Sequence, residues 1–289
     1  MGKQKRTRQH ARYTASRIAR SDYEEKPKAN HAARRERRSV PTAWESLAGW
    51  YDGWMGKQGS RHHRQLVIPM VRELLAPAPG ERILEVGAGQ GACAPCIVAA
   101  GASYVGVDAS PTLIRRAQRH HGKAGRFVVG DARHLAYVPE VEAGAFDGVL
   151  FALSLQDMDP LEQVLQAAAW ALRPGGRMVL ILTHPCFRVP RQSGWAWDGR
   201  RKLHARRVDR YLTPLAVPLK PPSAPRGATS RSFHRPLQSY INGLAACGLL
   251  VERVMEVPGL VHGTRDGGRA EEATNPEIPL FLGLRARRP

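Results

Sequence analysis

The chain has 289 residues, of which 43% are hydrophobic and 24% are charged, a composition typical of a globular protein. No apolar run reaches the roughly 18 residues that a membrane-spanning helix needs, so we expect no membrane span. Four cysteines in so long a chain argue against a disulfide scaffold, and the N-terminus has no apolar stretch that would indicate a secretory signal. These features predict a cytoplasmic protein.

The net charge of +19 is concentrated in two segments. Residues 1–40 contain 13 Lys/Arg against 4 Asp/Glu, and residues 187–235 contain 12 against 2, whereas the rest of the chain is neutral. We expect residues 1–40 to be a disordered basic tail, because they lack apolar periodicity, and residues 41–289 to form one domain. The positive charge permits RNA or another acidic partner, although a solvated basic segment is the simpler explanation.

The first half of the chain predicts alternating helices and strands. Helical spacing begins near Trp44 and returns over 64–75, where Pro69 favours a helix start close to the proline. Serine or aspartate followed by proline, at Ser110 and Asp159, predicts two capped helix starts. The expected strands are 82–86, 104–107, 126–129, 146–152 and 177–182, and the helices between them are 92–100, 110–121 and 159–172.

The second half departs from this alternation. A turn is expected at 173–176, and residues 187–235, rich in Arg and Pro, predict a long and partly flexible insertion. A helix over 236–247 and strands over 250–257 and 278–284 follow. Together these elements predict an α/β fold with a doubly wound sheet and helices on both faces.

The strongest motif is the glycine-rich turn Gly87-Ala-Gly89-Gln-Gly91, which follows one predicted strand and precedes a helix. Such a turn lets a ligand approach the backbone closely, and it also fits dinucleotide-binding proteins. Glu85 favours another ligand, because a carboxylate would repel a pyrophosphate at this helix N-terminus but would attract a cationic group.

Two further carboxylates end neighbouring strands. Asp108 lies 21 positions after Gly87, where its carboxylate can accept hydrogen bonds from both hydroxyls of a ribose. Asp131, which ends the third predicted strand, is placed to accept the amino group of a purine, although loops favour aspartate for other reasons as well. The two positions indicate a nucleoside ligand.

The order and spacing of these motifs resemble class I S-adenosylmethionine-dependent methyltransferases, and most closely the branch of quinone-biosynthesis enzymes. The resemblance rests on the segments 85–91, 108, 130–132, 146–147 and 173–176. It implies a seven-stranded Rossmann-like sheet whose last strand is antiparallel, an insertion after strand five, and S-adenosylmethionine as the cofactor. The resemblance implies a cofactor site formed by Tyr51, Glu85, Gly87, Ala88, Gly89, Asp108, Ala109, Asp131, Ala132 and Leu153.

Methyl transfer asks little of the protein beyond alignment, because a sulfonium is already a good leaving group. A general base is needed only if the acceptor atom must lose a proton. Asp157 and His184 are the best-placed catalytic candidates, since each follows a strand at the edge where open α/β sheets bind ligands. No metal site is expected, because Cys93 and Cys96 have no second ligand pair.

The sequence supports one leading function and one alternative. The first is methyl transfer to a small-molecule acceptor, with aromatic residues of segment 187–235 covering the pocket. The second is an RNA methyltransferase that holds phosphate through the basic tail and this insertion. The Trp195 and Trp197 rings, set among arginines, favour neither alternative, because they are able to bury an apolar acceptor or to stack on bases.

Overall fold

The computed structural model describes residues 44–219, 227–260 and 276–289. The predicted basic tail, residues 1–40, lies outside these ranges. Within them, no helix is long and apolar enough to cross a membrane.

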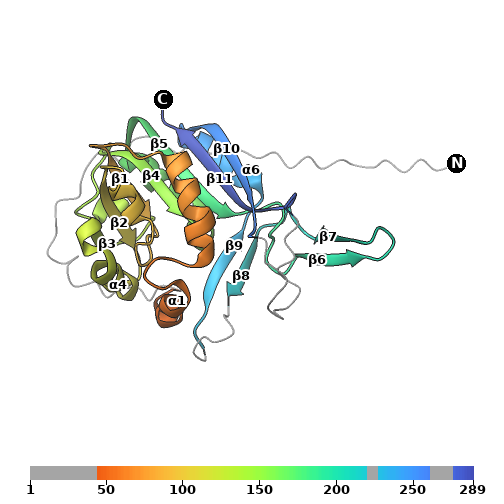
Figure 1. Ribbon diagram of the computed structural model, residues 1–289. Coiled ribbons are helices and arrows are strands. Elements are labelled where there is room, and N and C mark those ends of the chain that lie inside the picture. Colours follow the sequence, from red (N-terminus) through yellow and green to blue (C-terminus); the bar gives the residue numbers. More distant parts are fainter. Residues whose placement is uncertain (1–43, 220–226, 261–275) are drawn as a thin grey trace. The chain divides into compact units, whose positions relative to one another are not determined.

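A seven-stranded sheet with the order β10-β11-β5-β4-β1-β2-β3 forms the centre of the fold (Figure 1). Strands β1 to β5 are parallel, and β11 is antiparallel to both of its neighbours, β5 and β10. The predicted doubly wound α/β fold with an antiparallel last strand is therefore confirmed. The strands are β1 (Arg82–Val86), β2 (Ser103–Asp108), β3 (Arg126–Val129), β4 (Phe146–Ala152), β5 (Leu172–Thr183), β10 (Leu250–Pro258) and β11 (Pro279–Arg287).

Helices cover both faces of the sheet, because side chains alternate between the two faces of each buried strand. One face packs Leu84 and Phe146 against the helix that follows β4 and the helix that precedes β10. The other packs Ile83 and Leu150 against helical residues within 67–75, 94–98 and 111–121. The helices are α1 (Ala48–Met55), α2 (Ile68–Met70), α3 (Ala94–Val98), α4 (Pro111–His121), α5 (Leu161–Ala171) and α6 (Leu237–Ala246).

Three local predictions need correction. The helix around Pro69 does not start near the proline. π-helical turns at His63–Val67 and Val71–Leu75 flank it, and the helix continues although proline lacks a backbone N–H. Asp159 does not cap α5, since its carboxylate accepts a hydrogen bond from Arg235 instead. Residues 173–176 belong to β5, where the register to β4 shifts.

The insertion contains two β-hairpins that sequence analysis did not predict. Strands β6 (Ser193–Asp198) and β7 (Leu203–Val208) pair antiparallel, as do β8 (Leu215–Leu219) and β9 (Ser230–His234). In Figure 1 the first hairpin extends away from the central sheet. The sequence pattern did not indicate these strands, because arginine and proline are not among the residue types that favour strands.

Close packing makes a small residue necessary at Gly283 in β11. A Cβ at this position would lie 2.3 Å from Leu74 and 2.9 Å from Met70, and both side chains are buried. The Gly283→Ala variant should therefore lose about 1–3 kcal/mol of unfolding free energy through overpacking. Gly194→Ala is the control, because a Cβ in this strand glycine of β6 would meet no atom within 4 Å. Thermal denaturation of both variants checks the expectation, and equal melting temperatures would contradict it.

Candidate functional site

The glycine loop after β1 has a backbone that only glycine adopts readily. Gly87, Gly89 and Gly91 have φ angles of +76°, +56° and +81°. A Cβ at Gly87 would lie 2.5 Å from the side chain of Ser154, whereas one at Gly89 would meet only the Tyr51 ring, at 3.6 Å. The loop is thus packed against the protein at Gly87 and open at Gly89.

The Asp108 carboxylate fastens this loop to the end of β2. One of its oxygens accepts the backbone N–H of Gly89 and the other that of Ser110, both at 2.8 Å. Burial raises the pKa of Asp108, and the two N–H groups lower it. Each carboxylate oxygen keeps a lone pair for a further donor. Ala109 lies in the chain between Asp108 and Ser110, whose N–H the carboxylate accepts. The carboxylate is therefore oriented for a pair of hydroxyls, as a ribose presents them.

Glu85 lies under the glycine loop rather than in the open. Its side chain is buried, and it accepts a hydrogen bond of 2.6 Å from the Tyr104 hydroxyl. Burial raises the pKa of Glu85 to about 7, although the hydrogen bonds of Tyr104 and Cys93 act against this rise. Its role in the cofactor site stays a prediction, in which a cationic ligand above the loop would favour the charged form of the carboxylate.

Aromatic residues from the segment before β1 close the loop from the other side. The Tyr51 ring of α1 lies beside Gly89 and meets the Trp44 ring edge-on, with 5.2 Å between the ring centroids. Burial, with the nearby Asp108 as a smaller cause, raises the pKa of Tyr51 so that its hydroxyl stays protonated. Tyr51 is therefore a neutral hydrogen-bond donor at the edge of the loop.

The predicted adenine end of the site is only partly arranged for a ligand. Both oxygens of Asp131 accept hydrogen bonds from the Arg133 guanidinium, at 2.6 to 3.1 Å. Ala132, the next residue, packs against the hydrophobic core. A purine amino group would share the Asp131 carboxylate with Arg133, so this assignment stays a prediction.

Asp157 lies in a buried corner beyond β4. Leu153, the residue after β4, has a φ of +57°, and the chain then turns so that the Ser154 hydroxyl donates to the Val86 carbonyl. The Trp44 indole donates to Oδ2 of Asp157 at 3.2 Å. Burial raises the pKa of Asp157 to about 7, against the lowering effects of Ser232 and Trp44. This pKa permits proton exchange near neutral pH.

His184 has a different environment. Its Nε2 lies 2.7 Å from a carboxylate oxygen of Glu256, and its Nδ1 accepts the backbone N–H of Cys186. Burial lowers the pKa of His184, while Glu256 raises it. Because both ring nitrogens already have partners within the protein, this geometry suits a residue that positions the end of β5.

One buried acceptor atom of the glycine loop provides a test of whether a cationic cofactor fits. Among the described residues, Oε1 of Gln90 is buried and has no hydrogen-bond partner. An unsatisfied buried acceptor is costly, and the N–H donors of a ligand's ammonium group would relieve that cost. Together with the open backbone at Gly89 and the oriented Asp108, this atom fits S-adenosylmethionine.

Sequence analysis missed several residues that hold the site together. Glu45, just before α1, accepts hydrogen bonds from the Ser110 and Thr112 hydroxyls at the start of α4. Gln90 donates from its side chain to the Gly56 carbonyl and so connects the loop to the end of α1. No local pattern announces such contacts, because the partners lie 34 to 67 positions apart in the chain.

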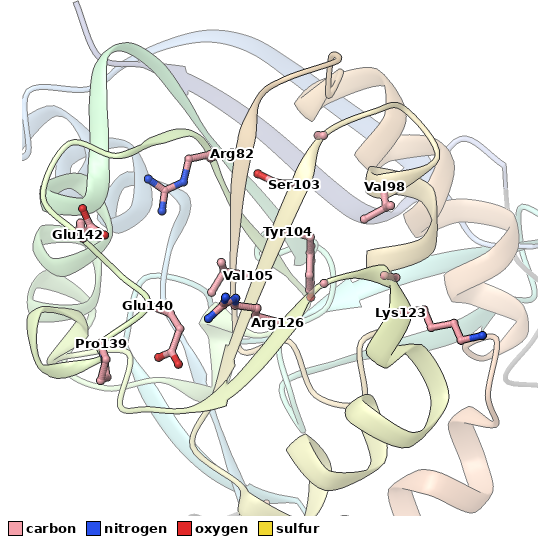
Figure 2. Close-up of a pocket in the computed structure, with 13 residues that line it drawn as sticks. Arg82, Val98, Ser103, Tyr104, Val105, Lys123, Arg126, Pro139, Glu140 and Glu142 are labelled. Carbon is pink, nitrogen blue, oxygen red and sulfur yellow. The ribbon is translucent and has the colours of Figure 1, made fainter.

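A surface hollow of about 670 Å³ lies at the other end of the sheet (Figure 2). Arg82, Ser103 and Arg126, which line it, belong to the amino ends of β1, β2 and β3. Open α/β sheets bind their ligands outside the carboxyl ends of the strands. None of the predicted site residues lines this hollow, so we do not assign the cofactor to it.

Comparisons with known proteins agree with this geometry. Residues 84–180 match a family model described as a methyltransferase domain. An S-adenosylmethionine-dependent methyltransferase from Mesorhizobium loti has a similar structure, with a TM-score of 0.61 and 26% identity over 76% of this chain and 96% of that one. Residues 84–180 therefore carry a methyltransferase domain, and the chain is similar in structure to an S-adenosylmethionine-dependent methyltransferase.

Curated relatives of this domain include quinone-biosynthesis enzymes. The demethylmenaquinone methyltransferase of Beutenbergia cavernae is 29% identical over 144 residues, which are 50% of this chain and 54% of that protein. The ubiquinone biosynthesis O-methyltransferase of Xanthomonas axonopodis pv. citri is 30% identical over 132 residues, which are 45% and 54%. The chain thus spans about half the length of the curated relatives it matches.

Because Glu85 is buried, we expect its replacement by the neutral glutamine to change the stability of the fold in a way that depends on pH. Since the pKa of Glu85 is about 7 in the fold and near 4.5 when unfolded, the folded protein retains a proton between these values. Its free energy of unfolding therefore falls as the pH rises from about 4.5 to about 7. Glu85→Gln should remove this contribution, so the variant melts no lower than the wild type at pH 8.

Calorimetric titration of the same variant tests the role of the charge. We expect Glu85→Gln to bind S-adenosylmethionine more weakly at pH 8, because the ligand's cationic groups lose a nearby carboxylate. A lower melting temperature at pH 8 would show instead that the carboxylate stabilises the fold, and unchanged affinity would remove Glu85 from the cofactor site.

Proposed function

We propose that this protein transfers the methyl group of S-adenosylmethionine to a small-molecule acceptor bound beside Asp157. The observation that carries the proposal is the buried Oδ1 of Asp157, which lacks a partner among the described residues at the carboxyl edge of the sheet. Ligands of open α/β sheets bind at this edge.

Three distant parts of the chain meet at this carboxylate. Trp44 precedes α1, Asp157 follows β4, and Ser232 belongs to β9 of the insertion. Tyr240 of α6 is also close enough for Asp157 to raise the pKa of its hydroxyl, after burial as the main cause. These walls are largely aromatic or small and polar, and such a lining suits a compact organic acceptor.

The residues support a simple division of labour. S-adenosylmethionine supplies an electrophilic methyl group on its sulfonium. Gly89 and Tyr51 would hold the methionine part, Asp108 the ribose and Leu153 the neighbourhood of the reacting methyl. Asp157 would orient the acceptor and accept its proton as the acceptor atom attacks, since its pKa of about 7 lies near the working pH.

Replacement of Asp108 tests the cofactor site. Asp108→Ala removes the acceptor for two ribose hydroxyls and also frees the N–H groups of Gly89 and Ser110. We expect a loss of about 1–3 kcal/mol in S-adenosylmethionine binding, or roughly 5- to 150-fold in Kd. Calorimetry measures this change, and Asp131→Ala in parallel shows whether the adenine end contributes. Wild-type affinity of Asp108→Ala would refute the assigned site.

Replacement of Asp157 tests the proposed base. Asp157→Asn should lower kcat by roughly 100-fold or more while S-adenosylmethionine affinity changes little. In the wild type, kcat should rise with pH through an apparent pKa near 7, because only the carboxylate accepts a proton. The variant should lose this dependence. Asp159→Asn is the control, since it makes the same chemical change at an exposed side chain two positions away.

The acceptor class is identified with methyl-labelled S-adenosylmethionine and a fractionated cell extract. We expect the label to appear in organic-extractable small molecules, and this product then serves as the substrate for the Asp157 measurements. Label confined to a macromolecular fraction that RNase removes would overturn the proposed acceptor class and leave the cofactor site intact.

A further inference from the structure

An unusual concentration of positive charge lies at the base of the β6–β7 hairpin. The guanidinium carbons of Arg188 and Arg206 lie 5.6 and 5.4 Å from the ring centroid of the same indole, Trp195. Trp195 and Arg206 are direct cross-strand partners, and Arg188 comes from the loop between β5 and β6. Three segments of the insertion thus bring two cations to one aromatic ring.

Neutral groups alone hold the two arginines in place. Arg206 donates to the Phe187 carbonyl at 2.8 Å and to the Ser193 hydroxyl at 3.0 Å. Arg188 donates through Nε to the Pro279 carbonyl at 3.3 Å. Within the described ranges, neither guanidinium pairs with a carboxylate. The cluster therefore carries two uncompensated positive charges.

The acidic side chains nearest in the chain have other partners. Asp198 accepts backbone N–H groups at the tip of its own hairpin, and Asp209 forms an ion pair with Arg207. Glu256 of β10 is paired with His184. None of these three carboxylates therefore neutralises Arg188 or Arg206.

Two hydrogen-bond donors of the cluster are unsatisfied. In the part of the chain that the structure describes, Nη2 of Arg188 and Nε1 of Trp195 are buried and have no partner. Burial, and then the proximity of Arg206, lower the pKa of Arg188 to about 10. Cation–π contact with the indole offsets only part of the cost of bringing two like charges together in a half-buried place.

We propose that Arg188, Trp195 and Arg206 form a binding site for the carboxylate or phosphate group of a small molecule. Every free polar atom of the cluster is a donor, so the site selects an acceptor-only group. An oxyanion would neutralise both guanidinium groups and accept the two buried N–H donors at once. The site is defined without reference to the methyl acceptor, so it stands or falls independently of the proposed function.

The indole N–H of Trp195 allows a direct test on the full-length protein. In a ¹H–¹⁵N correlation spectrum, this signal is assigned by its absence from Trp195→Phe. Inorganic phosphate, and acetate in a second series, are titrated at constant ionic strength against chloride. We expect a saturable downfield shift of the Trp195 signal with at least one oxyanion. The probe that binds more tightly distinguishes a phosphate from a carboxylate ligand. A shift no larger than that produced by chloride would overturn the proposal.

Variants test the contribution of each donor. Arg188→Gln should weaken oxyanion binding about tenfold or more, because a charged donor is lost. Arg207→Gln is the matched control. It removes the same charge from the position after Arg206 in β7, where the guanidinium already pairs with Asp209. Equal oxyanion affinity of Arg188→Gln and the wild type would refute the site.

A second variant guards against misfolding. Trp195→Phe retains a smaller aromatic ring for both arginines and removes the unpartnered N–H together with part of the indole. Calorimetry should show severalfold weaker oxyanion binding with unchanged S-adenosylmethionine affinity, which reports an intact fold. Undiminished oxyanion affinity in this variant would show that the indole donor takes no part in the site.

Discussion

The Asp108 carboxylate is the contact on which the carboxyl edge of the sheet depends. It accepts the N–H of Gly89 on one oxygen and that of Ser110 on the other, so it joins the glycine loop to the start of α4. Glu45 strengthens the same junction from the segment before α1. Without this carboxylate, the loop would lose the partner of its central N–H, and the open backbone at Gly89 would be less well ordered.

Two buried carboxylates flank this junction under different constraints. Glu85 and Asp157 both have a pKa raised by burial to about 7, but Glu85 lies under the loop with Tyr104, whereas Asp157 has one oxygen without a partner among the described residues. A carboxylate whose hydrogen bonds are made within the protein has little to offer a ligand, whereas an oxygen without a partner is available to one. This difference is the reason for assigning the acceptor to Asp157.

The two hairpins of the insertion contribute to different places. Ser232 of β9 lies close to Asp157, next to the proposed acceptor site. Trp195 of β6 and Arg206 of β7 belong to the cluster with Arg188, for which no acidic partner is found within the described ranges. One basic insertion thus contributes a side chain to the proposed acceptor site and a separate group of hydrogen-bond donors.

The sequence by itself determined the central sheet, the glycine loop and the position of Asp108. Strands 82–86, 126–129 and 146–152 were predicted with the bounds that the structure has, because alternation and turn residues act over a few neighbouring positions. Tertiary structure decided the rest. Trp44 reaches Asp157 across 113 positions and His184 reaches Glu256 across 72, while Asp159 bonds Arg235 instead of capping α5. Such partners depend on how elements pack, which local spacing does not encode.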